Sequence, residues 1–358
     1  MRPTYAEIDL GAIRHNVTVF KDLLAPSELC VVVKADGYGH GDAPVAEAAL
    51  DAGAEWLAVA LVEEGIRLRE AGIETAIVVL SEPDPRDAVD VAKWGLTPTV
   101  YTLGFVEALG ETGASLDVHV KVDTGLHRVG IAPSLLGELM GAIGSKAGLE
   151  VEALWTHFPV ADEDADYTRR QIDWFEETVS RYDVPMVHMA NTAGAILFPE
   201  SRRSMSRVGL GIYGLHPCAE TRDLVDLRPA MRIVSHVSHI QRLEAGARPS
   251  YGRIRALAAE ASVATAPIGY ADGYPRRLSD EGSALIGGRR YPLAGTVTMD
   301  QIVIDVDDAD VGVGDEVVLL GAQGDSEITA DEWATMLGTI SYEIVCGIGP
   351  RVPRRYLE

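Results

Sequence analysis

Eight short apolar runs, separated by helical patterns, set the strongest limit on how this chain can fold. The runs are LCVVVKA (29–35), WLAVALV (56–62), AIVVL (76–80), TPTVYT (97–102), VHVKVDTG (118–125), ALWTHF (153–158), PMVHMANT (185–192) and MSRVGLGIYGL (205–215). Most begin about 20 to 30 residues apart, and they read as buried parallel strands instead of half-exposed alternating ones. Eight such strand–helix units favour a (β/α)8 barrel over an open doubly wound sheet.

The pattern changes after about residue 225. Strand-like segments such as ASVATAPIGYADG and YPLAGTVTMDQIVIDV are separated there by Gly, Pro and Asp turns, and one stretch, TADEWATMLG, has a helical pattern. This alternation predicts a mostly-β fold. We therefore expect an α/β chain of two domains, a barrel over residues 1–225 and a smaller, mostly-β domain over residues 226–358.

The charge balance and the cysteines limit the possible partners and compartments. Lys and Arg total 31 against 54 Asp and Glu, a formal net charge of −23, which disfavours binding to nucleic acid or to anionic membranes. The three cysteines are widely spaced, as expected in a reducing compartment. No apolar run approaches the ~18 residues that span a bilayer, and the N-terminus has no apolar signal core. We expect a soluble, cytoplasmic protein.

Polar residues able to do chemistry end several of the predicted strands. They are Lys34, Lys121 with Asp123 and Arg128, His157, Asn191 with Thr192, and Arg207 with Gly209. Strand ends of a barrel meet at its C-terminal face, where the active sites of such proteins lie. Each residue alone could be a solvated charge or a helix cap, but together they predict a site that handles anions and carbonyl groups.

Lys34 is the candidate nucleophile of this site. Burial disfavours the charged form of an amine, and lysines that react with aldehydes need this effect. Pyridoxal 5'-phosphate (PLP) is an aldehyde cofactor that would also require a phosphate site. The segment GLGIYG (209–214) follows the eighth strand, where barrels commonly bind phosphate.

Other motifs in the sequence fail as signatures of a dinucleotide site or a metal site. GLGIYG also matches the dinucleotide pattern G-x-G-x-x-G, but that fingerprint must follow an early strand and open a helix. His236 and His239 lie three apart in a strand-like run and so face opposite sides, and the acidic run 305–316 lacks the ligand spacing of a calcium loop. We therefore predict no metal site.

With these residues in hand, the chain resembles the alanine racemases along its whole length. VVVKADGYGHG (31–41) is similar to the PLP-lysine motif of that family, and further similar motifs follow in order. They are KVDTGLHRVG (121–130), THF (156–158), MANTAG (189–194), SRVGLGIYGL (206–215), SYG (250–252), IGYADGYPRRL (268–278), GTVTMDQ (295–301) and ISYEIVCGIGPRVPRRY (340–356). The resemblance implies a PLP-binding barrel, a β-rich C-terminal domain and a head-to-tail homodimer with shared active sites.

The same resemblance implies two bases on opposite faces of the cofactor. Lys34 would bind PLP and act as one base, and Tyr251 of the partner chain would be the other. A phenol with an ordinary pKa of ~10 is a weak base, so His157 and Arg207 would assist Tyr251 through hydrogen bonds. Arg207 would also face the pyridine nitrogen, which an always-protonated guanidinium keeps unprotonated.

The remaining roles also come from the resemblance. The residues implied to bind the cofactor are Lys34, Tyr38, His157, Asn191, Thr192, Arg207, Gly209, Leu210 and Tyr342. Arg128, Met299 and Asp300 would bind substrate, Tyr270 and Tyr342 would narrow the entrance, and Lys121 matches a lysine that is often carbamylated. Two positions depart from the family pattern: Thr296 stands where arginine is usual, and His127 where small or amide residues are usual.

The expected reaction is therefore the PLP-dependent interconversion of L-alanine and D-alanine, which supplies D-alanine for cell-wall synthesis. A racemase of serine or of a broader range of amino acids is the main alternative. An amino-acid decarboxylase of the same fold is disfavoured by Arg207, since those enzymes place a carboxylate at the pyridine nitrogen. A non-catalytic PLP carrier with a single barrel is disfavoured by the second domain and Tyr251.

Overall fold

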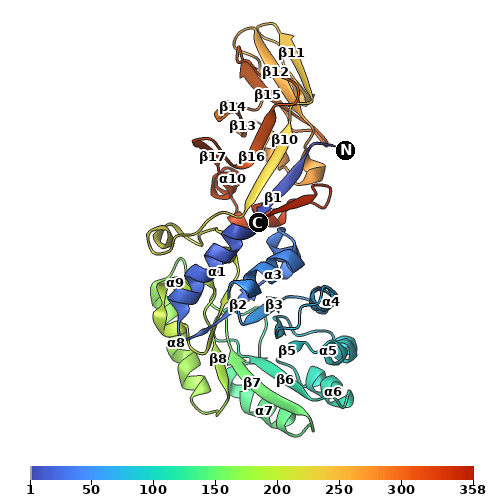
Figure 1. Ribbon diagram of the computed structural model, residues 1–358. Coiled ribbons are helices and arrows are strands. Elements are labelled where there is room, and N and C mark those ends of the chain that lie inside the picture. Colours follow the sequence, from blue (N-terminus) through green and yellow to red (C-terminus); the bar gives the residue numbers. More distant parts are fainter. Residues whose placement is uncertain (1, 280) are drawn as a thin grey trace. The chain divides into compact units, whose positions relative to one another are not determined.

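The computed structural model describes residues 2–279 and 281–358 and contains a closed barrel of eight parallel strands (Figure 1). The strands, in barrel order, are β2 (Glu28–Val32), β3 (Trp56–Val59), β4 (Ile77–Val79), β5 (Thr97–Val100), β6 (Leu116–Lys121), β7 (Leu149–Trp155), β8 (Met186–His188) and β9 (Met205–Val208). Each overlaps one of the eight apolar runs, which confirms the predicted (β/α)8 barrel. Pairing of β9 with β2 closes the barrel and sets Arg207 beside Cys30.

Helices alternate with these strands. They are α1 (Leu10–Leu24), α2 (Lys34–Tyr38), α3 (Asp42–Asp51), α4 (Val62–Glu70), α5 (Ala88–Lys93), α6 (Leu103–Glu111), α7 (Leu136–Gly144), α8 (Ala165–Val179) and α9 (Thr192–Leu197). The sequence of α8 shows why it forms. The side chain of Asp164 accepts a hydrogen bond from the Tyr167 N–H at its start, and Ile172, Phe175 and Val179 recur on one buried face.

The second part of the structure is mostly β, as the turn-rich sequence predicts. One sheet has the order β14-β13-β16-β10-β1-β18 with β17 paired to β16, and a smaller sheet has the order β11-β12-β15. The strands are β1 (Tyr5–Asp9), β10 (Met231–His236), β11 (His239–Leu243), β12 (Ala261–Ala266), β13 (Ser283–Ile286), β14 (Arg289–Pro292), β15 (Ile302–Asp307), β16 (Glu316–Gln323), β17 (Ser326–Ile328) and β18 (Arg354–Leu357). Two helices accompany them, α10 (Ala330–Leu337) and α11 (Ser341–Cys346).

The chain divides into two compact units. The barrel unit comprises Gly11–Gly37 and Gly41–Arg228, and the sheet unit comprises residues 2–10, Tyr38–His40 and Pro229–Glu358. This division differs from a single boundary after residue 225, because β1 pairs antiparallel with β10 and parallel with β18. The start of the chain therefore folds with its end.

The described residues include no helix with the length and apolar character needed to cross a bilayer.

Candidate active site

Lys34 begins a left-handed turn one residue beyond the buried end of β2. Ala35, Asp36 and Gly37 have φ values of 53°, 54° and 58°, and the left-handed conformation continues through Tyr38. Each non-glycine residue in this conformation costs roughly 1–2 kcal/mol, so the surrounding contacts must hold the turn in place. The Gly37 N–H donates to the carbonyl oxygen of the residue before Lys34, at 2.9 Å. The segment labelled α2 is therefore a strained left-handed turn and not a right-handed helix.

Glu64, a buried carboxylate on α4, fixes the start of this turn. Oε1 accepts a hydrogen bond from the Ala35 N–H at 2.7 Å, and Oε2 accepts from the N–H groups of Ala60 and Leu61 at 2.8 and 3.1 Å. One carboxylate therefore satisfies three backbone donors and ties the residue after Lys34 to the next strand–helix unit. Sequence reasoning missed Glu64, since nothing in the sequence distinguishes it from its exposed neighbour Glu63.

Arg207 lies at the centre of the barrel unit's polar residues, with 3% of its surface exposed. Nη1 donates to Nδ1 of His188, and Nη2 donates to Nδ1 of His157 at 3.2 Å and to the carbonyl oxygens of Thr156 and Met189 at 2.8 and 3.1 Å. Burial lowers the pKa of Arg207 to about 10. The guanidinium still carries its charge at neutral pH, and its partners are fixed.

These contacts determine the tautomers of the neighbouring histidines. A guanidinium has donors only, so His157 and His188 must accept at Nδ1 and carry their protons on Nε2. Nε2 of His188 then donates to Nδ1 of His119 at 3.1 Å, and Nε2 of His119 donates to Glu152 at 3.1 Å. Burial, with the charge of Arg207, lowers the pKa of His157, His188 and His119. All three rings are neutral, and the hydrogen bonds run in one direction from Arg207 to Glu152.

Lys121 ends β6 close to other cations. Its Nζ lies 4.6 Å from the centre of the Trp155 ring, and the guanidinium carbon of Arg207 lies at the same distance from that ring. Burial lowers the pKa of Lys121 to about 8, and the charges of Arg128, Arg207 and Lys34 add to the effect. The same charges lower the pKa of His157. The structure thus brings together the five basic residues predicted at this end of the barrel, an arrangement that suits anionic groups.

Asp123 shapes the loop that leads to Arg128. Its Oδ1 accepts hydrogen bonds from the N–H groups of Gly125 and His127 at 3.1 and 3.0 Å. Burial alone would raise the pKa of Asp123, but these donors outweigh it and lower the pKa. The exposed His127 has a φ of 55° and lies 3.5 Å from Oδ2 of Asp123. The unusual residue at position 127 therefore contacts the carboxylate that organises its own loop.

The predicted phosphate-binding residues of the barrel lie at the ends of β8 and β9. The Gly209 N–H donates to Oγ1 of Thr192 at 3.2 Å, and the buried Leu210 begins a 3₁₀ turn that follows β9. Oδ1 of Asn191 accepts from the Gly194 N–H at 2.9 Å and so caps α9. Asn191 thus has a structural role in the loop that presents Thr192.

The sheet unit carries the other predicted site residues. Tyr251, Met299 and Tyr270 have large exposed fractions, 73%, 52% and 42%. Oδ1 of Asp300 accepts from Arg351 at 2.7 Å. Among the residues that the structure describes, no hydrogen bond or ion pair joins the Tyr251 side chain to another predicted site residue of this unit.

Tyr38 and Tyr342 form a pair within the sheet unit. Their ring centres are 6.1 Å apart with an angle of 43° between the planes. Burial, followed by the proximity of Tyr342 and Cys346, raises the pKa of Tyr38. Its phenol therefore stays protonated and can donate a hydrogen bond.

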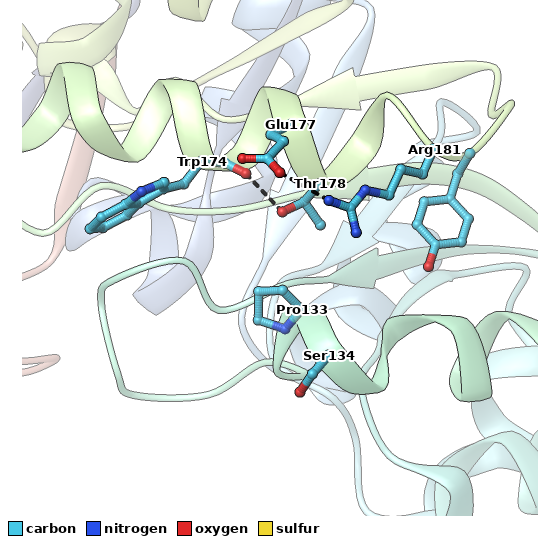
Figure 2. Close-up of a pocket in the computed structure, with 7 residues that line it drawn as sticks. Pro133, Ser134, Trp174, Glu177, Thr178 and Arg181 are labelled. Atoms are coloured by element: carbon cyan, nitrogen blue, oxygen red, sulfur yellow. Dashed lines mark hydrogen bonds and ion pairs between the residues drawn. The ribbon is translucent and has the colours of Figure 1, made fainter.

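A surface groove of about 310 Å³ lies elsewhere on the barrel unit (Figure 2). Trp174 and Glu177 of α8, with Arg181 just after this helix, line one side, and Pro133 and Ser134 line the other. The side chains of Glu177 and Arg181 are hydrogen-bonded to each other at 2.9 Å. None of the predicted site residues lines this groove.

Sequence reasoning overlooked the polar residues that continue the series of hydrogen bonds from Arg207. His119 and His188 lie among the apolar residues of β6 and β8. His119 precedes Lys121 by two positions, so the two side chains face the same side of β6. That spacing was a usable signal. Within the described part of the chain, no cluster of three or more His, Cys, Asp or Glu side chains is arranged to hold a metal ion.

Comparison with known proteins identifies the family of the chain. The family model "Alanine racemase, N-terminal domain" matches residues 8–217, and "Alanine racemase, C-terminal domain" matches residues 230–356. The chain is 46% identical to an alanine racemase of Symbiobacterium thermophilum, over 99% of this chain and 97% of the relative. It is 41% identical to one of Halothermothrix orenii, with the same shares covered.

Solved structures give the same result. The alanine racemase of Bacillus anthracis with bound L-Ala-P superposes with a TM-score of 0.94 at 37% identity, covering 100% of this chain and 96% of that one. An alanine racemase from a D-cycloserine-producing Streptomyces lavendulae superposes with a TM-score of 0.95 at 36% identity, covering 100% and 98%. The resemblance seen in the sequence is confirmed, and the chain belongs to the alanine racemase family of isomerases.

Proposed function

We propose that this protein interconverts L-alanine and D-alanine with PLP as its cofactor, using Lys34 and the Tyr251 of a second copy as its two bases. The observation that carries the proposal is the hydrogen bond from buried Arg207 to Nδ1 of His157. It fixes the proton of His157 on Nε2, where it can be donated to a phenolate oxygen.

The residues present fit PLP, which combines an aldehyde, a pyridine nitrogen and a phosphate. Lys34 offers an amine at a barrel strand end, and Arg207 offers donors to a ring nitrogen. Hydroxyl and backbone donors for the phosphate would come from Tyr38, Thr192, Gly209, Leu210 and Tyr342. When bound, PLP withdraws electrons from the substrate and stabilises the charge left when Cα loses its proton.

Arg207 would tune this effect. With a pKa of about 10 and no acceptor atom, it stays charged at neutral pH and keeps a pyridine nitrogen unprotonated. A weaker electron sink limits side reactions such as transamination, which suits a racemase. A carboxylate at this position would favour a decarboxylase.

The two bases would work from opposite faces of the substrate. Lys34 would exchange a proton with Cα on one face and Tyr251 on the other, which inverts the configuration. His157 would stabilise the phenolate by donating from Nε2. The 73% exposure of Tyr251 within a single chain supports its use by a partner chain, and so a homodimer.

The neighbouring residues would bind and admit the substrate. The guanidinium of Arg128 suits a carboxylate, together with Met299 and Asp300 of the partner. Tyr270 and Tyr342 would narrow the entrance in favour of a small side chain. A carbamate on Lys121 would add an anion beside Arg128, and a pKa near 8 makes the neutral amine that this modification needs accessible. The proposed setting is the cytoplasm, where the product D-alanine would serve cell-wall synthesis.

The deciding experiment combines the visible absorbance of the purified protein with D-alanine formation from L-alanine. Lys34→Ala should abolish both, and Tyr251→Phe should keep the absorbance but impair proton exchange at one face. Absorbance retained by the Lys34 variant would move the cofactor lysine elsewhere, and unchanged rates in the Tyr251 variant would remove it as a base. Comparing turnover of L-alanine, L-serine and L-lysine tests the substrate, and a preference for serine would overturn the alanine assignment.

A further inference from the structure

The turn that carries Tyr251 is held in a backbone conformation that its residues rarely adopt. Ser250, directly before Tyr251, has φ 65° and ψ −176°, a region used almost only by glycine. Gly252 and Arg253 follow with φ values of 71° and 50°. Such strain persists only where neighbouring contacts determine the conformation.

Two reciprocal hydrogen bonds supply these contacts. Oγ1 of Thr296 donates to the carbonyl oxygen of Tyr251 at 2.6 Å, and Oγ of Ser250 donates to the carbonyl oxygen of Thr296 at 2.5 Å. Thr296 is 5% exposed, so water competes little for its hydroxyl group. The two segments also approach closely at Gly295, where a Cβ atom would lie 2.5 Å from the Pro249 carbonyl oxygen.

We infer that Thr296 and Ser250 are positioning residues for Tyr251, which they hold in place through this pair of hydrogen bonds. The inference rests on the proposed function, in which Tyr251 exchanges a proton with the substrate. Proton transfer requires the phenol oxygen at a defined place, and a displacement of about 1 Å can cost a large factor in rate. Thr296 departs from the arginine usual at its position, and in this chain its hydroxyl group contacts the backbone of the proposed base.

The test compares Thr296→Val, which keeps the shape but removes the hydroxyl group, with Thr296→Ser, which keeps the hydroxyl group. In the holoenzyme, amide hydrogen exchange of residues 249–255 reports the order of the turn independently of activity. We expect faster exchange in the Val variant and wild-type exchange in the Ser variant. We also expect kcat to fall about tenfold in the Val variant, with loss of α-proton exchange from the same enantiomer that Tyr251→Phe affects.

Ser250→Ala removes the second bond and should show the same pattern, which keeps the inference testable if Thr296→Val does not fold. Wild-type amide exchange and kcat in the Val or Ala variant, beside an impaired Tyr251→Phe, would overturn the positioning role and leave the proposed function intact. An equal loss of α-proton exchange from both enantiomers would also overturn it. Full activity of Tyr251→Phe would instead remove Tyr251 as a base, and the inference with it.

Discussion

Nη1 of Arg207 lies 2.5 Å from Nδ1 of His188, and both side chains are buried inside the barrel. Because the guanidinium can only donate, this contact orients the whole series that continues through His119 to Glu152. A charged residue of the proposed site is thus supported by a row of neutral rings on β8 and β6. The contribution of these contacts to the free energy of unfolding can be measured.

Replacing His188 with leucine should destabilise the protein more than replacing it with asparagine. Leucine leaves a charged, buried donor of Arg207 without its partner, which costs about 3 kcal/mol. Asparagine keeps an acceptor oxygen near the position of Nδ1 and should cost less. Urea unfolding of the two variants beside the wild type measures both values, and equal losses would show that Arg207 does not depend on this acceptor.

Stability should decline as the pH falls below the ordinary pKa of histidine, about 6.5. Burial lowers the pKa of His119, His157 and His188, so the folded protein keeps these rings neutral while the unfolded chain takes up protons. The unfolded state then binds more protons, and each ring contributes up to about 1.4 kcal/mol per pH unit to the decline. Stability from this source is complete above about pH 6.5.

Urea unfolding from about pH 8 to about pH 5 gives the slope of this decline. His119→Gln should make the slope shallower, because one buried ring is removed. His239→Gln is the matched control, since His239 is exposed on the sheet unit. A slope that the His119 change leaves unaltered would contradict the assignment of a neutral ring at that position.

The barrel could be predicted from the sequence because its strands are buried on both faces and read as continuous apolar runs. Lys34, Lys121 and Arg207 stood out for the same reason, since each interrupts or ends such a run. The place of β1 could not be predicted. Its five residues, YAEID, suit many sheets, and its pairing with β10 and β18 depends on segments more than 200 residues away. Long-range pairing of this kind leaves no local signal.

The contacts among site residues were even harder to predict from the sequence. The alternation of His119 and Lys121 indicates a shared face, but only the closed barrel brings His119 to His188. The helix α10 was predicted from TADEWATMLG, whereas α11 was not, because SYEIVC is too short to show a helical period. In the sheet unit, the roles of the predicted site residues could be argued only from the resemblance to the alanine racemases.

Glu64→Gln should destabilise the turn that begins at Lys34. An amide has one oxygen where the carboxylate has two, so at least one of the three backbone N–H groups faces another donor, at a cost of about 1–3 kcal/mol. Bound PLP, followed by its visible absorbance, should be lost more readily on dilution. The matched control is Glu63→Gln, an exposed neighbour on α4, which should change stability by less than about 0.5 kcal/mol. Equal behaviour of the two variants would exclude a role for Glu64 in holding the turn.

Asp272→Asn should destabilise the sheet unit more than the loss of an exposed carboxylate does. The fully buried carboxylate accepts two hydrogen bonds from Arg2 at 2.8 Å, one from the Gly269 N–H at 2.9 Å, and lies 3.3 Å from Nε of Arg351. Removing its charge leaves two partly exposed guanidinium groups without their common anion, and the new amide nitrogen faces donors in a buried place, at a cost of about 1–3 kcal/mol.

Asp300→Asn provides the comparison, because Asp300 pairs with the same Arg351 but is largely exposed. An exposed pair contributes about 0–1 kcal/mol, so its loss should barely move the midpoint of urea unfolding. The contrast between the two variants separates burial from charge, since each replaces one carboxylate that pairs with Arg351. If Asp300→Asn destabilised the protein as much as Asp272→Asn, the loss would come from the unpaired Arg351 in both variants. The burial of Asp272 would then not explain the cost of removing its charge.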